Sequence, residues 1–263
     1  MKKRILLTAA LSLLSVVLLV LLTSCFTPKT SEGLKMEYGT IDDVFSGYIV
    51  VGRGVCPDKD IVIPYAYEGE PVIGIADRAF KNRTTITSVR IPRSVLAIGN
   101  EAFYNCESLE SVTMPTGMLA IGEKVFYNCK SLESMTLPNS VGYLGGSAFS
   151  GCENLTSIKL SKRLTEIYPS TFRDCKSLEE ITIPEGVTKI GESAFLRCES
   201  LVNLTIPKSV TSIERTAFIG CSSLETLDFA GTMAEWSAIS KGNRWCEKTL
   251  TSVTCSDGTV TLH

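Results

Sequence analysis

The sequence predicts a β-rich repeat solenoid, built from 23-residue coils and capped at both ends. Phenylalanine recurs at this interval without a slip, at positions 80, 103, 126, 149, 172, 195 and 218. Cysteine keeps the same interval from Cys106 to Cys221, and leucine or isoleucine keeps it from Ile86 to Leu224. A fixed period of about 20 to 50 residues is typical of solenoids, in which each unit buries its apolar face only against its neighbours.

Each coil is expected to contain one short parallel strand and one short helical or 3₁₀ turn. Leu109, Val112 and Met114 have the spacing of the inward side of a strand, and this spacing at a period of 23 is typical of leucine-rich repeats. Pro115 lacks an N–H and should end the strand. A second apolar pair then returns the chain to the core, and the Ala-Phe that follows is expected in the turn.

The aligned phenylalanines are expected to form a continuous column through the core. Parallel stacking places equivalent residues about 4.8 Å apart, and each buried ring contributes about 1.5–3 kcal/mol before ordering entropy is subtracted. We therefore interpret the column as structural and assign none of its members to a ligand.

The segments that flank the repeats read as caps. Residues 38–78 are the predicted N-terminal cap, with β-rich runs at 48–51 and 61–64 separated by glycine and proline. Residues 79–229 are the predicted leucine-rich repeat array. Residues 230–263 are the predicted C-terminal cap, in which Trp236 replaces the isoleucine of earlier coils and should plug the last core layer.

Residues 1–24 read as an export signal. Lys2, Lys3 and Arg4 precede an apolar run over residues 5–22. A permanent transmembrane helix is the alternative, since about 20 apolar residues suffice to span a bilayer. The sequence Leu-Thr-Ser-Cys that ends at Cys25 resembles the lipobox of bacterial lipoproteins. This resemblance implies cleavage before Cys25, lipidation of Cys25, and a lipidated tether over residues 25–37 that anchors the chain to a membrane.

Composition argues against several functional classes. The net charge is −2, and without the three basic residues of the signal it is −2 − 3 = −5, so the chain lacks the basic face that nucleic-acid binding requires. The only histidine is His263, at a chain end. Catalytic triads and most catalytic zinc sites need a histidine held by its surroundings. We therefore predict no enzyme activity, no catalytic residue, no cofactor and no metal.

The cysteine column from Cys106 to Cys221 is predicted to be a row of buried thiols that pack as small apolar groups. Disulfides between neighbouring coils are the alternative, since the expected Cα spacing would allow them. A metal site is disfavoured because metal ligands cluster around a point. Cys246 and Cys255 are the candidate disulfide, and Cys56 is expected to be unpaired.

One column of charged residues alternates strictly in sign along the array. Its members are Glu107, Lys130, Glu153, Lys176 and Glu199. We expect these charges to favour the correct register between coils, although an exposed pair contributes only about 0–1 kcal/mol.

The exposed strand face is the predicted binding surface, because solenoids usually bind along such a face. Small hydroxyl side chains dominate its outward positions, and threonine is also simply a good strand former. Tyr104, Tyr127 and Tyr143 lie off the strand and offer a rival patch. The candidate ligand-binding residues are Arg90, Thr113, Thr136, Lys159, Glu180, Thr182, Asn203 and Thr205.

The repeat as a whole resembles the BspA-like, or Treponema-type, leucine-rich repeat family over about residues 40–260. Residues 183–198 carry almost the full pattern of Ile-Pro, Val-x-x-Ile-Gly and Ala-Phe-x-x-Cys. The resemblance implies a bacterial cell-surface protein, and some members of that family are adhesins. The expected function is non-catalytic adhesion to a protein ligand, such as host extracellular matrix or a cell-surface protein, from the outer membrane. The alternative is a structural, envelope-organising periplasmic lipoprotein without a host ligand.

Overall fold

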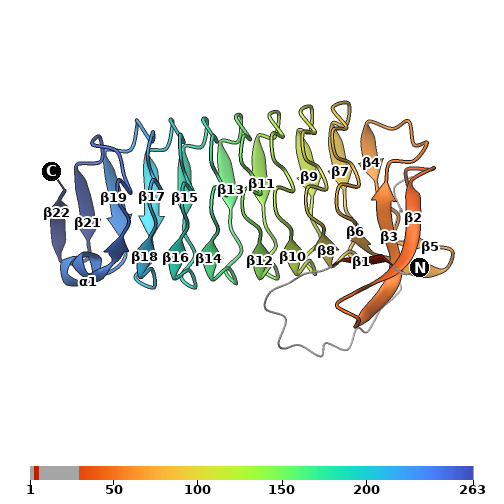
Figure 1. Ribbon diagram of the computed structural model, residues 1–263, viewed down its shortest axis with the longest axis horizontal. Coiled ribbons are helices and arrows are strands. Elements are labelled where there is room, and N and C mark those ends of the chain that lie inside the picture. Colours follow the sequence, from red (N-terminus) through yellow and green to blue (C-terminus); the bar gives the residue numbers. More distant parts are fainter. Residues whose placement is uncertain (1–2, 6–29, 263) are drawn as a thin grey trace.

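The computed structural model, which describes residues 3–5 and 30–262, is a single row of stacked coils with a cap at each end (Figure 1). The predicted signal peptide and Cys25 therefore lie outside the described residues, apart from β1 (Lys3–Ile5), which pairs in parallel with β2. Each coil contains two short strands, one more than the sequence predicts. The additional strand is formed by the second apolar segment of the repeat.

The N-terminal cap contains the predicted β-rich runs in longer form. β2 (Lys35–Ile41) and β3 (Phe45–Gly52) form an antiparallel hairpin, and β6 (Glu70–Ile75) pairs in parallel with β3. β5 (Ala66–Tyr67) pairs with β6 and closes the cap. β4 (Asp60–Val62) pairs in parallel with the first strand of the array, so the cap begins both strand rows of the solenoid.

The array repeats its two strands in constant register. The first row, which forms the strand face, is β7 (Ser88–Arg90), β9 (Ser111–Thr113), β11 (Ser134–Thr136), β13 (Ser157–Lys159), β15 (Glu180–Thr182), β17 (Asn203–Ile206) and β19 (Thr226–Phe229). The second row is β8 (Ala97–Ile98), β10 (Ala120–Ile121), β12 (Tyr143–Leu144), β14 (Glu166–Ile167), β16 (Lys189–Ile190) and β18 (Ser212–Ile213). All pairings between consecutive coils are parallel.

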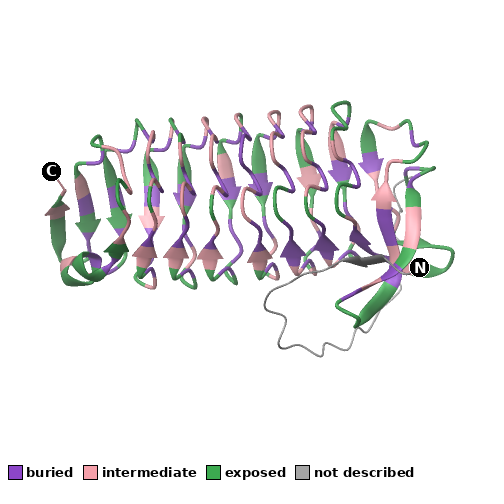
Figure 2. Ribbon diagram, in the orientation of Figure 1, coloured by how far each residue is buried: buried purple, intermediate pink, exposed green. Residues whose placement is uncertain are grey.

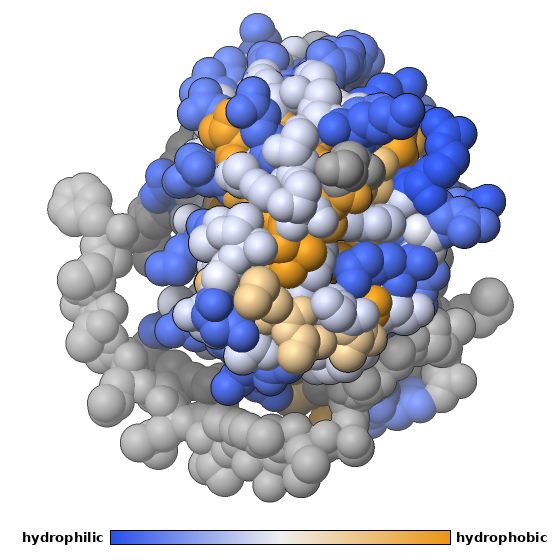
Figure 3. Space-filling model, turned by 90° about the vertical axis from the view of Figure 1, so that its left-hand side faces the viewer, coloured by the Kyte–Doolittle hydropathy of each residue, from blue (hydrophilic) through white to orange (hydrophobic). Residues whose placement is uncertain are grey.

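The C-terminal cap ends the core with a short helix and a hairpin. Helix α1 (Met233–Ala238) begins at a capping box, in which Thr232 and Glu235 exchange side-chain and backbone hydrogen bonds. β20 (Ser240–Lys241) extends the second row, and β21 (Ser252–Cys255) with β22 (Gly258–Thr261) extends the first. Trp236 is 1% exposed and plugs the last layer, as predicted. Seen end-on, the cap is mainly hydrophilic, with apolar side chains visible near its centre (Figure 3).

The core is the predicted column of phenylalanines. All seven rings are essentially unexposed, and consecutive ring centroids lie 5.2–5.8 Å apart. Their planes are within 20° of parallel. Trp245 then packs edge-on against Phe218 and ends the column. Burial follows the same columns along the whole array (Figure 2).

The Ala-Phe segment forms two successive β-turns, and no 3₁₀-helix occurs within the described residues. In one coil the N–H of Tyr104 donates to the carbonyl of Glu101, and the N–H of Cys106 donates to that of Phe103. Glu101 and Asn105 both adopt a φ of 56°. These left-handed residues point alternate peptide groups along the axis, so Phe103 N–H donates to the carbonyl of Val125 in the next coil (3.0 Å). This turn ladder continues from Phe80 to Phe218.

Both strand rows are interrupted, whereas the turn ladder is not. β9 does not pair with β11 in the first row, and β12 does not pair with β14 in the second. The coil that contains β11 and β12 is thus joined to the preceding coil through its second strand and to the following coil through its first. At both junctions the turn ladder and the phenylalanine column provide the continuous connection.

Candidate functional site

The predicted binding residues lie on the outward side of the strand face, in two columns. Ser157 pairs with Glu180, Thr136 with Lys159 and Thr182 with Thr205, so equivalent side chains stand directly beside one another. The first seven of the eight are exposed and the last is half-buried: Arg90, Thr113, Thr136, Lys159, Glu180, Thr182, Asn203 and Thr205.

The interruption between β9 and β11 divides this surface. Arg90 and Thr113 belong to the three-stranded sheet β4-β7-β9, whereas the other six belong to the seven-stranded sheet that begins at β11. Arg90, Lys159 and Glu180 form no side-chain hydrogen bond or ion pair with the rest of the described chain. Their charges are therefore available to a partner. Lys159 on β13 and Glu180 on β15 stand on adjacent strands, so the surface carries a positive and a negative charge side by side.

The N-terminal end of the strand face carries a carboxylate with two hydroxyl donors, a group that sequence reasoning missed. Asp60, on β4, accepts hydrogen bonds from the hydroxyls of Thr87 (2.8 Å) and Ser88 (2.7 Å). The hydrogen bond from Ser88, followed by that from Thr87, holds the pKa of Asp60 below its usual range. The parallel register of β4 with β7 brings these side chains together. Because Asp60 lies outside the 23-residue period, the repeat pattern gave no signal for it.

The column cysteines are buried, as predicted, and each also donates a hydrogen bond. The Sγ of Cys106 donates to the carbonyl of Phe80 in the preceding coil (3.2 Å), and the five later thiols repeat this contact at 3.1–3.2 Å. Burial raises the pKa of Cys106 to about 12. No group of three metal-ligating side chains occurs within residues 3–5 and 30–262.

The candidate disulfide is not formed in this structure, since both Cys246 and Cys255 are free thiols. The backbone of Cys246 forms an isolated parallel β-bridge with that of Phe218, whereas Cys255 ends β21 and pairs with Gly258 within the final hairpin. Cys56 is free and buried. Cys25 lies outside the described residues, so its lipidation stays a prediction. Within the residues that the structure describes, no helix has the length and apolar character of a membrane span.

The alternating charge column forms ion pairs in one direction only. Lys130 contacts Glu107 (3.1 Å) and Lys176 contacts Glu153 (3.3 Å), each reaching back one coil. The same spacing of one coil recurs in ion pairs outside that column, including Arg215 with Glu192. These pairs support the predicted role in register, because a slip of one coil would separate them.

The rival tyrosine patch is divided between two parts of the coil. Tyr104 and Tyr127 stack face to face in the turns, with centroids 4.8 Å apart, whereas Tyr143 lies on β12 and packs edge-on against Tyr168. A different tyrosine cluster, absent from the prediction, occupies the N-terminal cap. There Tyr48 packs against Tyr38 and Tyr67, and its hydrogen bond to Glu68, together with burial, raises its pKa to about 12.

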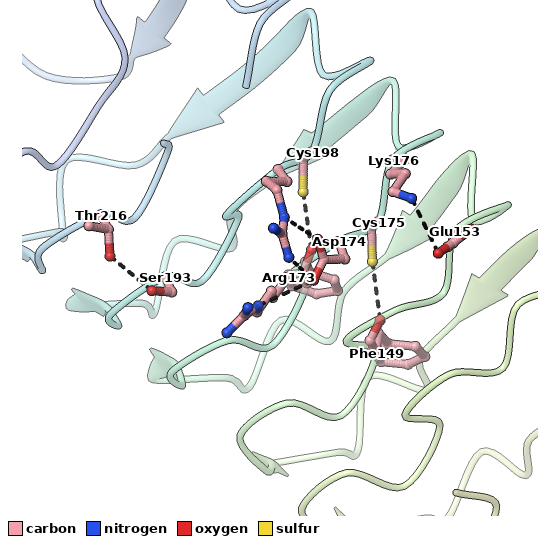
Figure 4. A network of polar contacts seen from close by, with 11 residues as sticks. Phe149, Glu153, Arg173, Asp174, Cys175, Lys176, Ser193, Cys198 and Thr216 are labelled. Carbon is pink, nitrogen blue, oxygen red and sulfur yellow. Dashed lines mark hydrogen bonds and ion pairs between the residues drawn. The ribbon is translucent and has the colours of Figure 1, made fainter. Parts of the chain in front are cut away.

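The turns also carry a polar network that sequence reasoning missed (Figure 4). Arg197 donates two hydrogen bonds to Asp174, of 2.5 and 2.9 Å, and we call this pair the Asp174–Arg197 clamp. Arg173 donates a third hydrogen bond to Asp174 at 3.2 Å. Burial acts to raise the pKa of Asp174, but the contacts with Arg197 and then Arg173 outweigh it and lower that pKa. The Lys176–Glu153 pair lies beside this group, and together they border a cavity of about 400 Å³.

Comparison with known proteins places these features in a family context. The family model for the BspA-type leucine-rich repeat region matches six copies, over residues 73–195 and 165–257. No curated protein matches the chain.

Solved bacterial structures are similar to this chain. A leucine-rich repeat protein of T. pallidum is 25% identical with a TM-score of 0.55, over 82% of this chain and 89% of that one. A leucine-rich repeat protein from Bacteroides ovatus is 22% identical with a TM-score of 0.50, over 88% and 71%. A leucine-rich cell surface protein from Faecalibacterium prausnitzii is 22% identical with a TM-score of 0.42, over 82% and 98%.

Proposed function

The chain belongs to the BspA-type leucine-rich repeat family, and from this premise we propose that it is a non-catalytic adhesion protein. Its ligand is a host matrix protein or a protein on a neighbouring cell surface. Membership of this family favours a protein-binding role over an enzymatic one, and the specific ligand class is part of the proposal.

The observation that carries the proposal is the strand face itself. It presents two aligned columns of polar side chains on a long surface whose neighbouring strands are paired, apart from the interruption between β9 and β11. Arg90, Lys159 and Glu180 stand out of it without internal partners. Charged groups arranged in this way steer a protein partner and fix its register, whereas the surrounding hydroxyls supply hydrogen bonds.

The proposed location is the outer surface of a bacterial cell. Lipidation of Cys25 would anchor the chain close to its N-terminal cap, because Ser31 and Leu34 of the predicted tether already pack into that cap. Digestion of intact cells with a protease tests this part. An outward-facing protein is degraded, whereas a protein protected until the envelope is permeabilised would instead have an envelope-organising role.

Binding is tested by titrating soluble residues 26–263 over immobilised fibronectin, fibrinogen and laminin. A circular dichroism spectrum first establishes that the protein is folded. Saturable binding to at least one of the three, weakened by the Arg90→Ala/Lys159→Ala double substitution and by added salt, supports adhesion through the strand face. Flat responses from folded protein across the whole panel would remove the support for adhesion to host matrix.

A further inference from the structure

A side-chain column on the turns is interrupted in the middle of the array. The residue after each column phenylalanine is Lys81, Tyr104 and Tyr127 in the first three coils, but it is Ser150 in the fourth. The next position is Asn82, Asn105 and Asn128, and then Gly151. The fourth coil therefore loses two bulky side chains at once. Its backbone keeps the regular path, since Asn128 N–H still donates to Ser150 and Gly151 N–H to Arg173, both at 2.8 Å.

The loss of these side chains leaves a notch in the row of turns, and this notch is the cavity of about 400 Å³ described above. Ser150 and Gly151 form its floor. One wall is the end of the aromatic stack, and the other is the Asp174–Arg197 clamp with the Lys176–Glu153 pair. Figure 4 shows Glu153 on one turn and Asp174 and Lys176 on the next.

The aromatic wall ends at Tyr127, which is half-buried and lines the cavity. Lys81 Nζ lies 4.5 Å from the centroid of the Tyr104 ring, and Tyr104 stacks on Tyr127 with 3° between the planes. A third ring would continue this stack above Ser150, where the chain supplies only a hydroxymethyl group. The notch therefore has room for a flat group at the next stacking position, about 4.8 Å further along the axis.

The amide row beside this stack also ends at the notch. Asn105 Nδ2 donates to Asn82 Oδ1, and Asn128 Nδ2 donates to Asn105 Oδ1, each at 3.1 Å. The Oδ1 of Asn128 accepts no hydrogen bond within the described residues, and it projects over Gly151, where a Cβ would meet it at 2.1 Å. An acceptor that faces the cavity is thus left for a hydroxyl donor.

The charges of the notch indicate a neutral ligand. Its lining carries the carboxylates of Glu153, Asp174 and Glu199 and the cations of Lys176 and Arg197. With Arg173, which contacts Asp174, the positive and negative groups balance. An anion would face the carboxylates and a cation would face the guanidinium and ammonium groups. An aromatic side chain of a protein would cover paired charges without replacing their water, which is costly.

We propose that the notch binds a single pyranose residue of a carbohydrate. One apolar face of the sugar ring packs on Tyr127, and the hydroxyls around the rim donate to Asn128 Oδ1 and exchange hydrogen bonds with the Asp174–Arg197 clamp. A sugar matches this mixture because each hydroxyl both donates and accepts. The site lies on the turns, away from the strand face, and does not depend on adhesion through that face.

The test is saturation-transfer-difference NMR of the full chain in detergent micelles with D-glucose, D-galactose, D-mannose and N-acetylglucosamine. The test variant is Ser150→Tyr/Gly151→Asn, which gives the fourth coil the Tyr-Asn pair of the second and third. The new asparagine suits the local backbone, because Asn105 and Asn128 already adopt a φ of 56° at that position, and the side-chain oxygen of Asn128 must move aside for its Cβ. The control is Lys81→Tyr, which places a tyrosine at the same turn position three coils away, at the other end of the aromatic stack.

We expect saturable transfer to at least one sugar in the unmodified chain and in the control, and loss of that signal in the test variant. Tyr127→Leu, which keeps an apolar side chain without an aromatic face, is expected to weaken binding about tenfold. It provides a second readout if the test variant does not fold. The proposal is overturned if none of the four sugars binds, or if binding survives in the folded test variant or is unchanged by Tyr127→Leu. Matrix-protein binding by the same variants tests the strand face separately.

Discussion

Phe126 is expected to be the ring on which the continuity of the array depends most. It is fully buried, with centroids of Phe103 and Phe149 at 5.6 and 5.3 Å. Its coil contains β11 and β12. β11 does not pair with β9 of the preceding coil, and β12 does not pair with β14 of the following coil. Phe126→Ala should lower the free energy of unfolding by about 3–5 kcal/mol, the usual cost of truncating a buried phenylalanine. This includes two stacked ring contacts of about 0.5–1.5 kcal/mol each.

The same substitution is predicted to uncouple the two halves of the solenoid. Repeat arrays unfold as one unit only while the interfaces between neighbouring repeats are strong enough. Both tryptophans, Trp236 and Trp245, lie in the C-terminal cap, so their fluorescence reports that end, whereas far-ultraviolet circular dichroism reports the whole chain. In urea the two signals should coincide for the unmodified protein and separate for Phe126→Ala.

Phe195→Ala is the matched control. Its ring has two neighbours at 5.3 Å, and both strand rows are continuous through its coil. It should lose a similar free energy of unfolding while its two signals still coincide. If Phe126→Ala costs less than about 1 kcal/mol, well below the range for buried rings, or if its signals still coincide, the reasoning about the interrupted rows is refuted.

Three further predictions concern charge, strain and thiol chemistry. Arg78 and then Lys81 lower the pKa of Glu101 to about 2. The ionised carboxylate therefore stabilises the fold fully above its unfolded pKa of about 4.5, and this stabilisation is lost as the pH falls towards 2. In thermal unfolding, Glu101→Gln should lower the stability by about 1 kcal/mol at pH 7 and leave it unchanged at pH 2. Lys124 is exposed, has a φ of 52°, and has no side-chain partner among the described residues. Because asparagine tolerates this left-handed conformation better than lysine, Lys124→Asn should raise the free energy of unfolding by up to about 1 kcal/mol in urea titrations. An unchanged or lower urea midpoint would argue against strain at this residue. In thiol labelling of the native protein, half-buried Cys246 should react before the six column cysteines, and early reaction of the column would contradict their burial.

The periodic part of the fold was predictable because one interval fixes it. Once phenylalanine recurs every 23 residues, parallel stacking determines which side chains share a column and which face outward. That is why the strand face, the buried cysteines and the plug at Trp236 all follow from the sequence. The thiol hydrogen bonds did not follow, because they depend on the direction of each phenylalanine carbonyl.

Departures from the period were harder to interpret. The interruptions beside β11 and β12 have no counterpart in the apolar pattern, which continues through both neighbouring coils. The capping box at Thr232 and Glu235 carries the sequence signature of a helix start. The notch had a visible signal too, since Ser150 and Gly151 replace a tyrosine and an asparagine in otherwise regular columns. Interpreting it needed the stack of Tyr104 on Tyr127, which the sequence alone does not establish.

The central claim, that the strand face is the binding surface, is tested most directly by comparing two double variants on the same matrix protein. Arg90→Ala/Lys159→Ala removes two exposed cations from the strand face, and Lys124→Ala/Arg163→Ala removes two exposed cations outside it. Both lower the net charge equally, so a general electrostatic effect would weaken binding equally. The dissociation constant is expected to rise only for the strand-face variant. An equal rise for both variants, or a rise only for Lys124→Ala/Arg163→Ala, would contradict it.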